Sequence, residues 1–186
     1  MAYTLYDKDG SKVEFGDLQD KGPWCEKGAG YEEVFVQRYG GRLGLTINPA
    51  KQTDKYAPDL LSVGGGRLGD LKTQNTPFFQ AQTRYSIDPQ YAVVFNQKDR
   101  ERYKRLYPAI DIFFWVDWIA VRFLSGGKEM TVRPMSGVWS IPFEELDVLL
   151  ETAPLHVYQQ RRDDREGNAR SSYVISLQRG EFKQVA

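Results

Sequence analysis

The sequence has very little of two residue types on which much enzyme chemistry depends. Its 186 residues include one cysteine, Cys25, and one histidine, His156. A lone cysteine forms no internal disulfide, and one histidine beside it does not supply a zinc site, so a stapled secreted scaffold and a Cys/His metal cluster are both excluded. A serine or cysteine hydrolase would depend wholly on His156. Because His156 lies in an apolar, strand-like stretch, we expect a structural histidine, and chemistry based on carboxylates, lysine or a hard metal ion.

Long hydrophobic runs and a net charge are also absent. No apolar run approaches the ~18 residues that a membrane helix needs, and the first ten residues lack the apolar region of a secretory signal. We therefore expect a soluble, cytoplasmic protein with no membrane partner. The 25 basic and 25 acidic side chains balance, yet residues 71–134 carry ten Lys/Arg against six Asp/Glu. With 41% hydrophobic residues, the length suits one domain with a sizeable core.

Hydrophobic periodicity and turn residues predict the order of the elements. Alternation on both sides of Asp9-Gly10 predicts an opening hairpin, and aromatic residues at helical spacing predict a helix over 24–39 that ends at Gly40-Gly41. The long apolar run 110–123 is predicted to be one central strand. The hairpin strands are expected over 3–6 and 12–15, further strands over 43–47, 59–63, 67–73, 91–95, 155–160 and 172–177 and as a pair after 127, helices over 97–106 and 142–151, a polar loop over 51–57 and a protruding connector over 161–170. This order indicates an α/β or α+β domain with a central mixed sheet flanked by helices.

The most informative segment contains two carboxylates, a lysine and a run of glycines. In a strand, Asp70 and Lys72 point to the same face, whereas Leu71 points to the opposite face and into the core. The turn at Gly64-Gly65-Gly66 predicts a hairpin in which the carboxylates of Asp59 and Asp70 can meet at one end. Two such oxygen ligands suit Mg²⁺ or Mn²⁺. Lys72 beside them can orient an attacking water or neutralise charge on a phosphate.

Pro58-Asp59, ten intervening residues and then Asp70-Leu71-Lys72 resemble the motif of the PD-(D/E)xK nuclease superfamily, to which many restriction, repair and recombination nucleases belong. The resemblance implies a restriction-endonuclease-like core over about 22–125 within a single domain, 1–186. An extra C-terminal helix and β-hairpin, over about 135–186, would exceed that core. The motif lies between a helix and a later unit of strand, basic helix and strand, which is the order that this fold requires.

The resemblance also implies an activity, the hydrolysis of DNA phosphodiester bonds with Mg²⁺, or Mn²⁺, as cofactor. The implied catalytic residues are Asp59, Asp70, Lys72 and a carboxylate of the first helix, and the implied metal-site residues are Asp59, Asp70, Leu71 and that same carboxylate. The candidates for the helix carboxylate are Glu32 and Glu33. Glu32 shares the buried stripe of Phe35 and Tyr39 and is preferred, because a carboxylate on an apolar face needs a partner such as a metal ion. Glu33 stays the alternative.

Other residues are candidates for a supporting role. Gln74 lies two positions beyond Lys72 on the same strand face and is a further site residue. On the basic helix, Lys98, Arg102 and Arg105 fall at i, i+4 and i+7 and share a face that suits a phosphate backbone. The full set of residues expected to bind DNA is Arg67, Arg84, Lys98, Arg102 and Arg105.

One alternative is set aside and three others stay open at this stage. Gly64 to Gly69 also satisfies the G-x-G-x-x-G pattern, but the residues that follow predict strand and loop where a dinucleotide site needs a helix, so we set that site aside. A catalytically idle nucleic-acid-binding or structural module on the same fold is the rival to a nuclease. The sequence leaves RNA as a substrate and a homodimer as an assembly equally open.

Overall fold

The computed structural model of the chain describes residues 3–13, 30–157 and 171–186. The first six residues of the helix expected over 24–39, the end of the first hairpin at residues 14–15, the end of the strand expected over 155–160 and the connector 161–170 lie outside the described residues. Among the described residues, no helix is long and apolar enough to cross a membrane.

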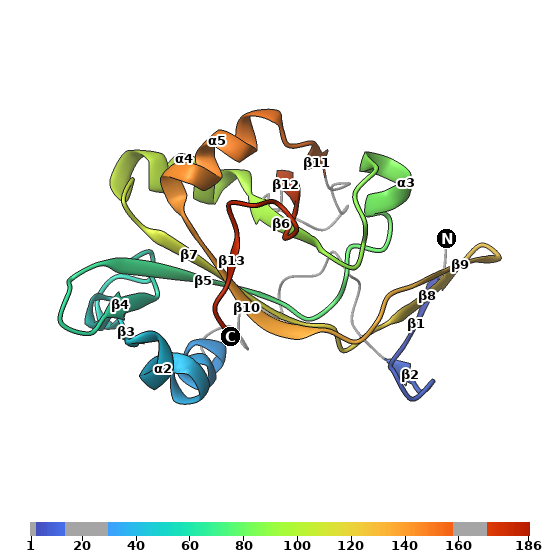
Figure 1. Cartoon of the computed structure of the whole chain (residues 1–186), viewed down its shortest axis with the longest axis horizontal. Helices are drawn as coiled ribbons and strands as arrows, with labels where there is room; N and C mark the ends of the chain where they lie inside the picture. Colours follow the sequence, from blue (N-terminus) through green and yellow to red (C-terminus); the bar gives the residue numbers. More distant parts are fainter. Residues whose placement is uncertain (1–2, 14–29, 158–170) are drawn as a thin grey trace.

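The centre of the molecule is a mixed sheet of six strands (Figure 1). In spatial order they are β13 (Lys183–Gln184), β10 (Ser136–Pro142), β7 (Asp111–Asp117), β5 (Leu68–Gln74), β4 (Leu60–Ser62) and β3 (Leu45–Ile47). The neighbours β5 and β7 are parallel, whereas the other neighbouring pairs are antiparallel. The expected α+β class with a central mixed sheet is therefore confirmed, and the C-terminal part of the chain supplies two of the strands.

Two smaller sheets adjoin the central one. The first has the order β2 (Lys12–Val13), β1 (Tyr3–Tyr6), β8 (Arg122–Ser125) and β9 (Lys128–Thr131), and the second has the order β11 (Leu155–Val157), β12 (Ser171–Ser176) and β6 (Ala92–Asn96). The antiparallel pairs β1 with β2 and β11 with β12 confirm two of the predicted hairpins within the described residues.

The helical segments are short. They comprise residues 30–35, the π-helix η1 (Val36–Gly40), α2 (Gly41–Leu43), the 3₁₀ helix η2 (Pro49–Gln52), α3 (Ala81–Tyr85), α4 (Gln97–Leu106) and α5 (Phe143–Thr152). The helix predicted over 97–106 is confirmed with its bounds, and α5 confirms the helix predicted over 142–151 to within one residue. The polar loop expected over 51–57 overlaps the second half of η2.

The predicted end of the first helix is wrong. Gly40 and Gly41 have right-handed helical backbone angles, and the helix continues to Leu43, where Gly44 caps it with φ of 64°. Gly40 has a different physical reason to be glycine, because a Cβ there would lie 2.6 Å from the backbone oxygen of Leu45. The left-handed conformation that ends this helix is thus adopted by Gly44, and not by Gly40 or Gly41.

The apolar run 110–123 is also not one strand. β7 ends at Asp117, and the chain then leaves the central sheet and enters another sheet at Arg122 as β8. Between them the backbone N–H groups find new partners, for example Trp118 with the carbonyl of Met135 and Val121 with that of Tyr6. The strands after residue 127 likewise pair with β8 and β7, and not with each other.

Helices cover both faces of the central sheet. Alternate residues of β7 divide between two cores: Ile112, Phe114 and Val116 face the core that α4 and α5 cover, whereas Phe113 and Trp115 face Phe35 of the first helix. Figure 1 shows α4 and α5 on one side of the sheet and α2 on the other. The strand β5, beside β7, therefore lies between two helical layers.

Candidate active site

The motif residues lie on the hairpin of β4 and β5. Leu60 pairs with Gly69 and Leu61 with Leu68, which places Asp59, just before β4, beside Asp70 of β5. The turn contains glycines in the left-handed region, with φ of 78° at Gly64 and 64° at Gly66. The paired residues of the two strands are Leu60 with Gly69 and Leu61 with Leu68, so Asp59, which precedes Leu60, lies outside the ladder. Its carboxylate can therefore reach across to β5.

Asp59 is buried and its carboxylate is held at both oxygens. Oδ2 accepts a hydrogen bond from the backbone N–H of Leu71 at 3.0 Å. Oδ1 lies 2.5 Å from the ammonium nitrogen of Lys51. The contact with Leu71 ties the first half of the motif directly to the second half, as a pair of ligands on neighbouring strands requires.

Glu32 is the helix carboxylate that reaches this place. Its Oε1 lies 3.2 Å from Lys51 Nζ, so the lysine lies between Glu32 and Asp59. Burial and the negative charge of Asp59 raise the pKa of Glu32 to about 7, although Lys51 acts in the opposite direction. Glu33 is exposed. Of the two predicted candidates, the structure brings Glu32 and not Glu33 to Asp59.

Asp70 and Lys72 point from β5 towards α4. Lys72 Nζ lies 2.6 Å from Asp70 Oδ2 and 2.6 Å from Oδ2 of Asp99, and it donates a hydrogen bond to the Tyr103 hydroxyl at 3.2 Å. Burial by itself would lower the pKa of Lys72, but Asp70, Tyr103 and Asp99 outweigh it and hold this pKa well above its ordinary value. Lys72 is therefore a permanent cation.

The Asp70 carboxylate is the most deeply buried of the site. It is 2% exposed, and burial together with the charge of Asp59 raises its pKa against the opposing effect of Lys72. Within the described part of the chain, no group donates a hydrogen bond of good geometry to Asp70 Oδ2, although Lys72 Nζ is close to it. A buried carboxylate oxygen with spare capacity is ready to accept a further donor or a cation.

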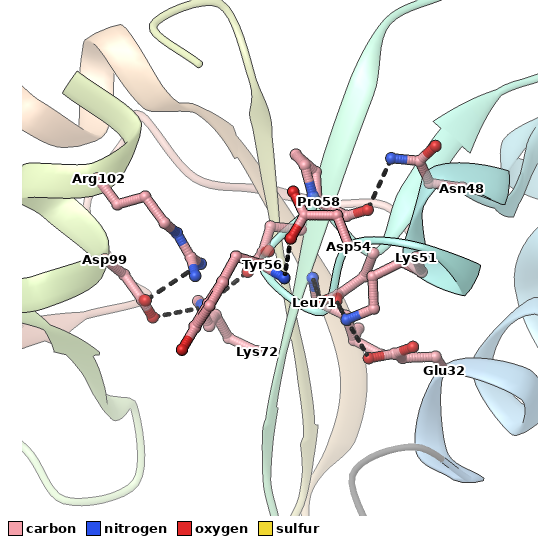
Figure 2. A network of polar contacts seen from close by, with 12 residues as sticks. Glu32, Asn48, Lys51, Asp54, Tyr56, Pro58, Leu71, Lys72, Asp99 and Arg102 are labelled. Atoms are coloured by element: carbon pink, nitrogen blue, oxygen red, sulfur yellow. Dashed lines mark hydrogen bonds and ion pairs between the residues drawn. The ribbon is translucent and has the colours of Figure 1, made fainter. Parts of the chain in front are cut away.

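The site divides into two ion-pair clusters around β5. Figure 2 shows Lys72 with Asp99 and Arg102 on one side of Leu71, and Lys51 with Glu32 on the other. Leu71 packs its side chain in the core beneath the first helix and gives its N–H to Asp59, so the only group that it could offer to a metal is its backbone oxygen. All the carboxylate donors are hard oxygen ligands, the type that Mg²⁺ and Mn²⁺ prefer.

Three participants, Asp99, Tyr103 and Lys51, were not predicted, and Arg102 was expected only as a DNA-binding residue. Asp99 and Tyr103 lie four residues apart on α4 and therefore share the helix face that meets Lys72, a signal that the sequence did contain. Arg102 donates to the Tyr103 hydroxyl at 2.7 Å and lies 3.2 Å from Asp99. Lys51 lies in η2, and nothing in the sequence pattern connected it with the motif.

The other predicted residues have varied surroundings. The amide of Gln74 bonds with both backbone groups of Val94, at 3.1 Å and 3.2 Å, and so links β5 to β6. Arg67 forms an ion pair with Asp111 at 2.6 Å. The expected DNA-binding residues that are exposed are Arg67, Arg84, Lys98 and Arg105, whereas Arg102 is partly buried in the Lys72 cluster. His156 is buried and contacts the Tyr85 hydroxyl through Nδ1 at 2.7 Å, as a structural histidine would.

As it stands, the described part of the chain contains no group of three acidic, histidine or cysteine side chains arranged to hold a metal ion. Lysine ammonium groups lie where the carboxylates converge, Lys51 between Glu32 and Asp59 and Lys72 between Asp70 and Asp99. Asp59 is the carboxylate common to both clusters, because its charge acts on Glu32 and on Asp70, and with the spare capacity of Asp70 Oδ2 these donors are of the hard oxygen type that a divalent cation prefers.

Comparison with known proteins does not assign the chain to a family. No protein-family model matches it, and neither do any curated protein or any solved structure.

Proposed function

We propose that the protein is a Mg²⁺-dependent nuclease that hydrolyses DNA phosphodiester bonds and has a restriction-endonuclease-like core. The observation that carries the proposal is the contact between the two halves of the motif: Asp59 accepts the N–H of Leu71, between Asp70 and Lys72. Metal-assisted hydrolysis of a phosphodiester uses carboxylates to hold the ion and positive charge near the phosphoryl oxygens, and this segment contains carboxylates and a charged lysine.

The order of the elements supports the same proposal. The helical residues 30–43 precede the antiparallel strands β3, β4 and β5, and α4 then leads to β7, which returns parallel to β5. The first helix and α4 pack on opposite faces of these strands. This is the succession of helix, motif strands, basic helix and strand that the resemblance to the PD-(D/E)xK nucleases implies.

Each residue then has a role that follows from its surroundings. Asp59, Asp70 and Glu32 would hold the metal ion together with the backbone oxygen of Leu71. When bound, such an ion supplies positive charge to the phosphate and lowers the pKa of a bound water. Lys72, because it stays protonated, donates hydrogen bonds and stabilises negative charge on the phosphoryl oxygens, and it does not serve as a base.

Residues around Lys72 act on its position. Asp99 and the Tyr103 hydroxyl fix the ammonium group from α4, and Arg102 in turn holds Asp99 and Tyr103. The exposed arginines and lysines of the predicted set would contact the phosphate backbone, which makes binding dependent on salt.

The test is cleavage of linear, circular and single-stranded DNA with Mg²⁺ or Mn²⁺ by the wild type, Asp70→Asn and Lys72→Met. We expect each variant to lose at least about a hundredfold in rate. Circular dichroism checks that each variant is folded, because Lys72→Met leaves Asp70 and Asp99 without their lysine and lowers stability. Glu33→Gln, which changes an exposed acid on the same helix as Glu32, is the matched control and should cut like the wild type. Undiminished turnover in both site variants would refute the proposal.

The rival is a nucleic-acid-binding module with an idle site. It is favoured by one observation, namely that Lys51 and Lys72 already neutralise the carboxylates at which a metal would bind. Under this reading the wild type binds DNA in a filter assay but cuts neither DNA nor RNA with either metal.

A further inference from the structure

We infer that Lys51 occupies the position of the divalent cation in the metal-free protein, and that a cation bound by Asp59 displaces the Lys51 ammonium group into solvent. The inference rests on the metal site of the proposed function. It starts from Asp59, whose Oδ2 accepts the Leu71 N–H while Oδ1 lies 2.5 Å from Lys51 Nζ. The Leu71 N–H is held by the hairpin and already uses one lone pair of Oδ2, so Oδ1 is the oxygen at which Lys51 and a cation compete.

The chain places Lys51 at this point by more than one tether. Asn48, which is buried, caps η2 through its side-chain oxygen, which accepts the N–H of Ala50 at 3.2 Å. Its side-chain amide donates to the carbonyl of Pro58 at 2.9 Å, and its own N–H donates to the carbonyl of Asp59 at 2.9 Å. The turn that carries Lys51 is therefore joined to the segment that carries Asp59, and only the flexible lysine side chain remains to move.

Lys51 and Lys72 differ in how they are held. Lys72 has contacts with two carboxylates and a hydroxyl, and its ammonium lies over the rings of Phe95 and Tyr103 at 5.7 Å and 5.4 Å. Its departure would leave buried carboxylates unpaired, which is costly. Among the described residues, the partners of the Lys51 ammonium group are the carboxylates of Glu32 and Asp59. Its side chain keeps 23% of its exposure, so water can solvate the ammonium group as it leaves.

The charges favour exchange. Glu32 and Asp59 together carry two negative charges when ionised, and Lys51 balances one of them. A divalent cation in the same place balances both and can use several oxygens at once. The lysine thus stabilises the two carboxylates without competing strongly with the metal, because its ammonium group is partly exposed and keeps access to water.

The rate of lysine acetylation measures the displacement of the Lys51 ammonium group directly. The wild-type protein is treated with acetic anhydride with and without saturating Mg²⁺, and the rate at each lysine is measured by mass spectrometry of its peptides. We expect the rate at Lys51 to rise about fivefold or more with Mg²⁺, while the rate at Lys55, an exposed lysine four residues away, stays unchanged. An equal or slower rate at Lys51 in saturating Mg²⁺ would overturn the inference.

Metal affinity gives an independent readout. Lys51→Met should bind Mn²⁺ about fivefold more tightly than the wild type in calorimetric titration, because the competing ammonium group is gone. Two controls should bind Mn²⁺ like the wild type. Lys51→Arg keeps the positive charge at position 51, and Lys55→Met removes the charge of an exposed lysine outside the cluster. Unchanged or weaker binding by a folded Lys51→Met, or no Mn²⁺ binding by any of the proteins, would contradict the inference.

Both experiments leave DNA out, so the two proposals can fail separately. Metal-dependent exposure of Lys51 in a protein that cuts no nucleic acid would refute the nuclease and keep the exchange. Cleavage that requires Asp70 and Lys72, with no change at Lys51 on metal binding, would keep the nuclease and refute the exchange.

Discussion

Replacing Glu32 by glutamine should stabilise the metal-free protein at alkaline pH relative to the wild type. The folded protein raises the pKa of Glu32 from its ordinary 4.5 to about 7, chiefly by burial and by the neighbouring Asp59. Between pH 4.5 and pH 7 the Glu32 carboxyl group has lost its proton in the unfolded chain but keeps it in the native protein. Stability therefore falls as pH rises, and the contribution of Glu32 is fully present below pH 4.5 and lost above pH 7.

The magnitude follows from the difference between the two pKa values. A difference of 2.5, from 4.5 to 7, corresponds to about 3.4 kcal/mol at 1.36 kcal/mol for each pH unit. Because the Glu32 side chain retains 18% exposure and solvent screens its charge, we expect about 1–2 kcal/mol. Glutamine does not ionise, so Glu32→Gln should gain this amount over the wild type between pH 4 and pH 8.

Urea unfolding in EDTA at pH 4, 6 and 8 measures this difference. Glu33→Gln is the control. Because Glu33 is exposed, the free energy of unfolding of this variant should change with pH as that of the wild type does. A difference between Glu32→Gln and the wild type that is the same at all three pH values would refute the reasoning, because it would mean that Glu32 titrates alike in both states.

Two further predictions concern stability alone. Gly40→Ala should lower the free energy of unfolding in urea by about 1–3 kcal/mol, since its Cβ would lie 2.6 Å from the Leu45 oxygen. Gly41→Ala should be neutral or stabilising, because a Cβ there meets nothing within 4 Å among the described residues beyond its own helix. Equal effects of the two substitutions would contradict this prediction. Asp147→Asn should cost about 1 kcal/mol at pH 7 and less as the pH falls, because Lys104 at 2.9 Å and Arg100 at 2.6 Å hold the pKa of Asp147 below its ordinary value although burial acts the other way. A loss independent of pH would show that packing, and not charge, is responsible.

The elements predicted best are those whose pattern is local. The helix over 97–106 begins after Asn96 and ends before Pro108, and its bounds follow from residues within it and beside it. The motif hairpin is similar, because three consecutive glycines determine where β4 and β5 turn. Glu32 was distinguished from Glu33 by helical spacing alone, and the structure places it at Asp59 as that spacing indicated.

Errors arose where partners from distant segments decide the outcome. Residues 110–123 are mostly apolar, yet the chain changes sheets after Asp117, where its backbone groups bond with those of other segments. The first helix continues through Gly40, and the reason for a glycine there is tertiary, because a Cβ would meet the backbone oxygen of Leu45.

The sequence by itself determined the mixed α+β class, the hairpin of the motif and the side-chain alternation that puts Asp70 and Lys72 on one face of β5. Those properties depend on spacing along the chain, which hydrophobic period and turn residues record. Only the tertiary structure decided that Lys51 lies between Glu32 and Asp59 and that Asp99 meets Lys72. Charged side chains reach several ångströms and pair across elements that are far apart in sequence, so their partners are determined by the packing of the sheet between its helices.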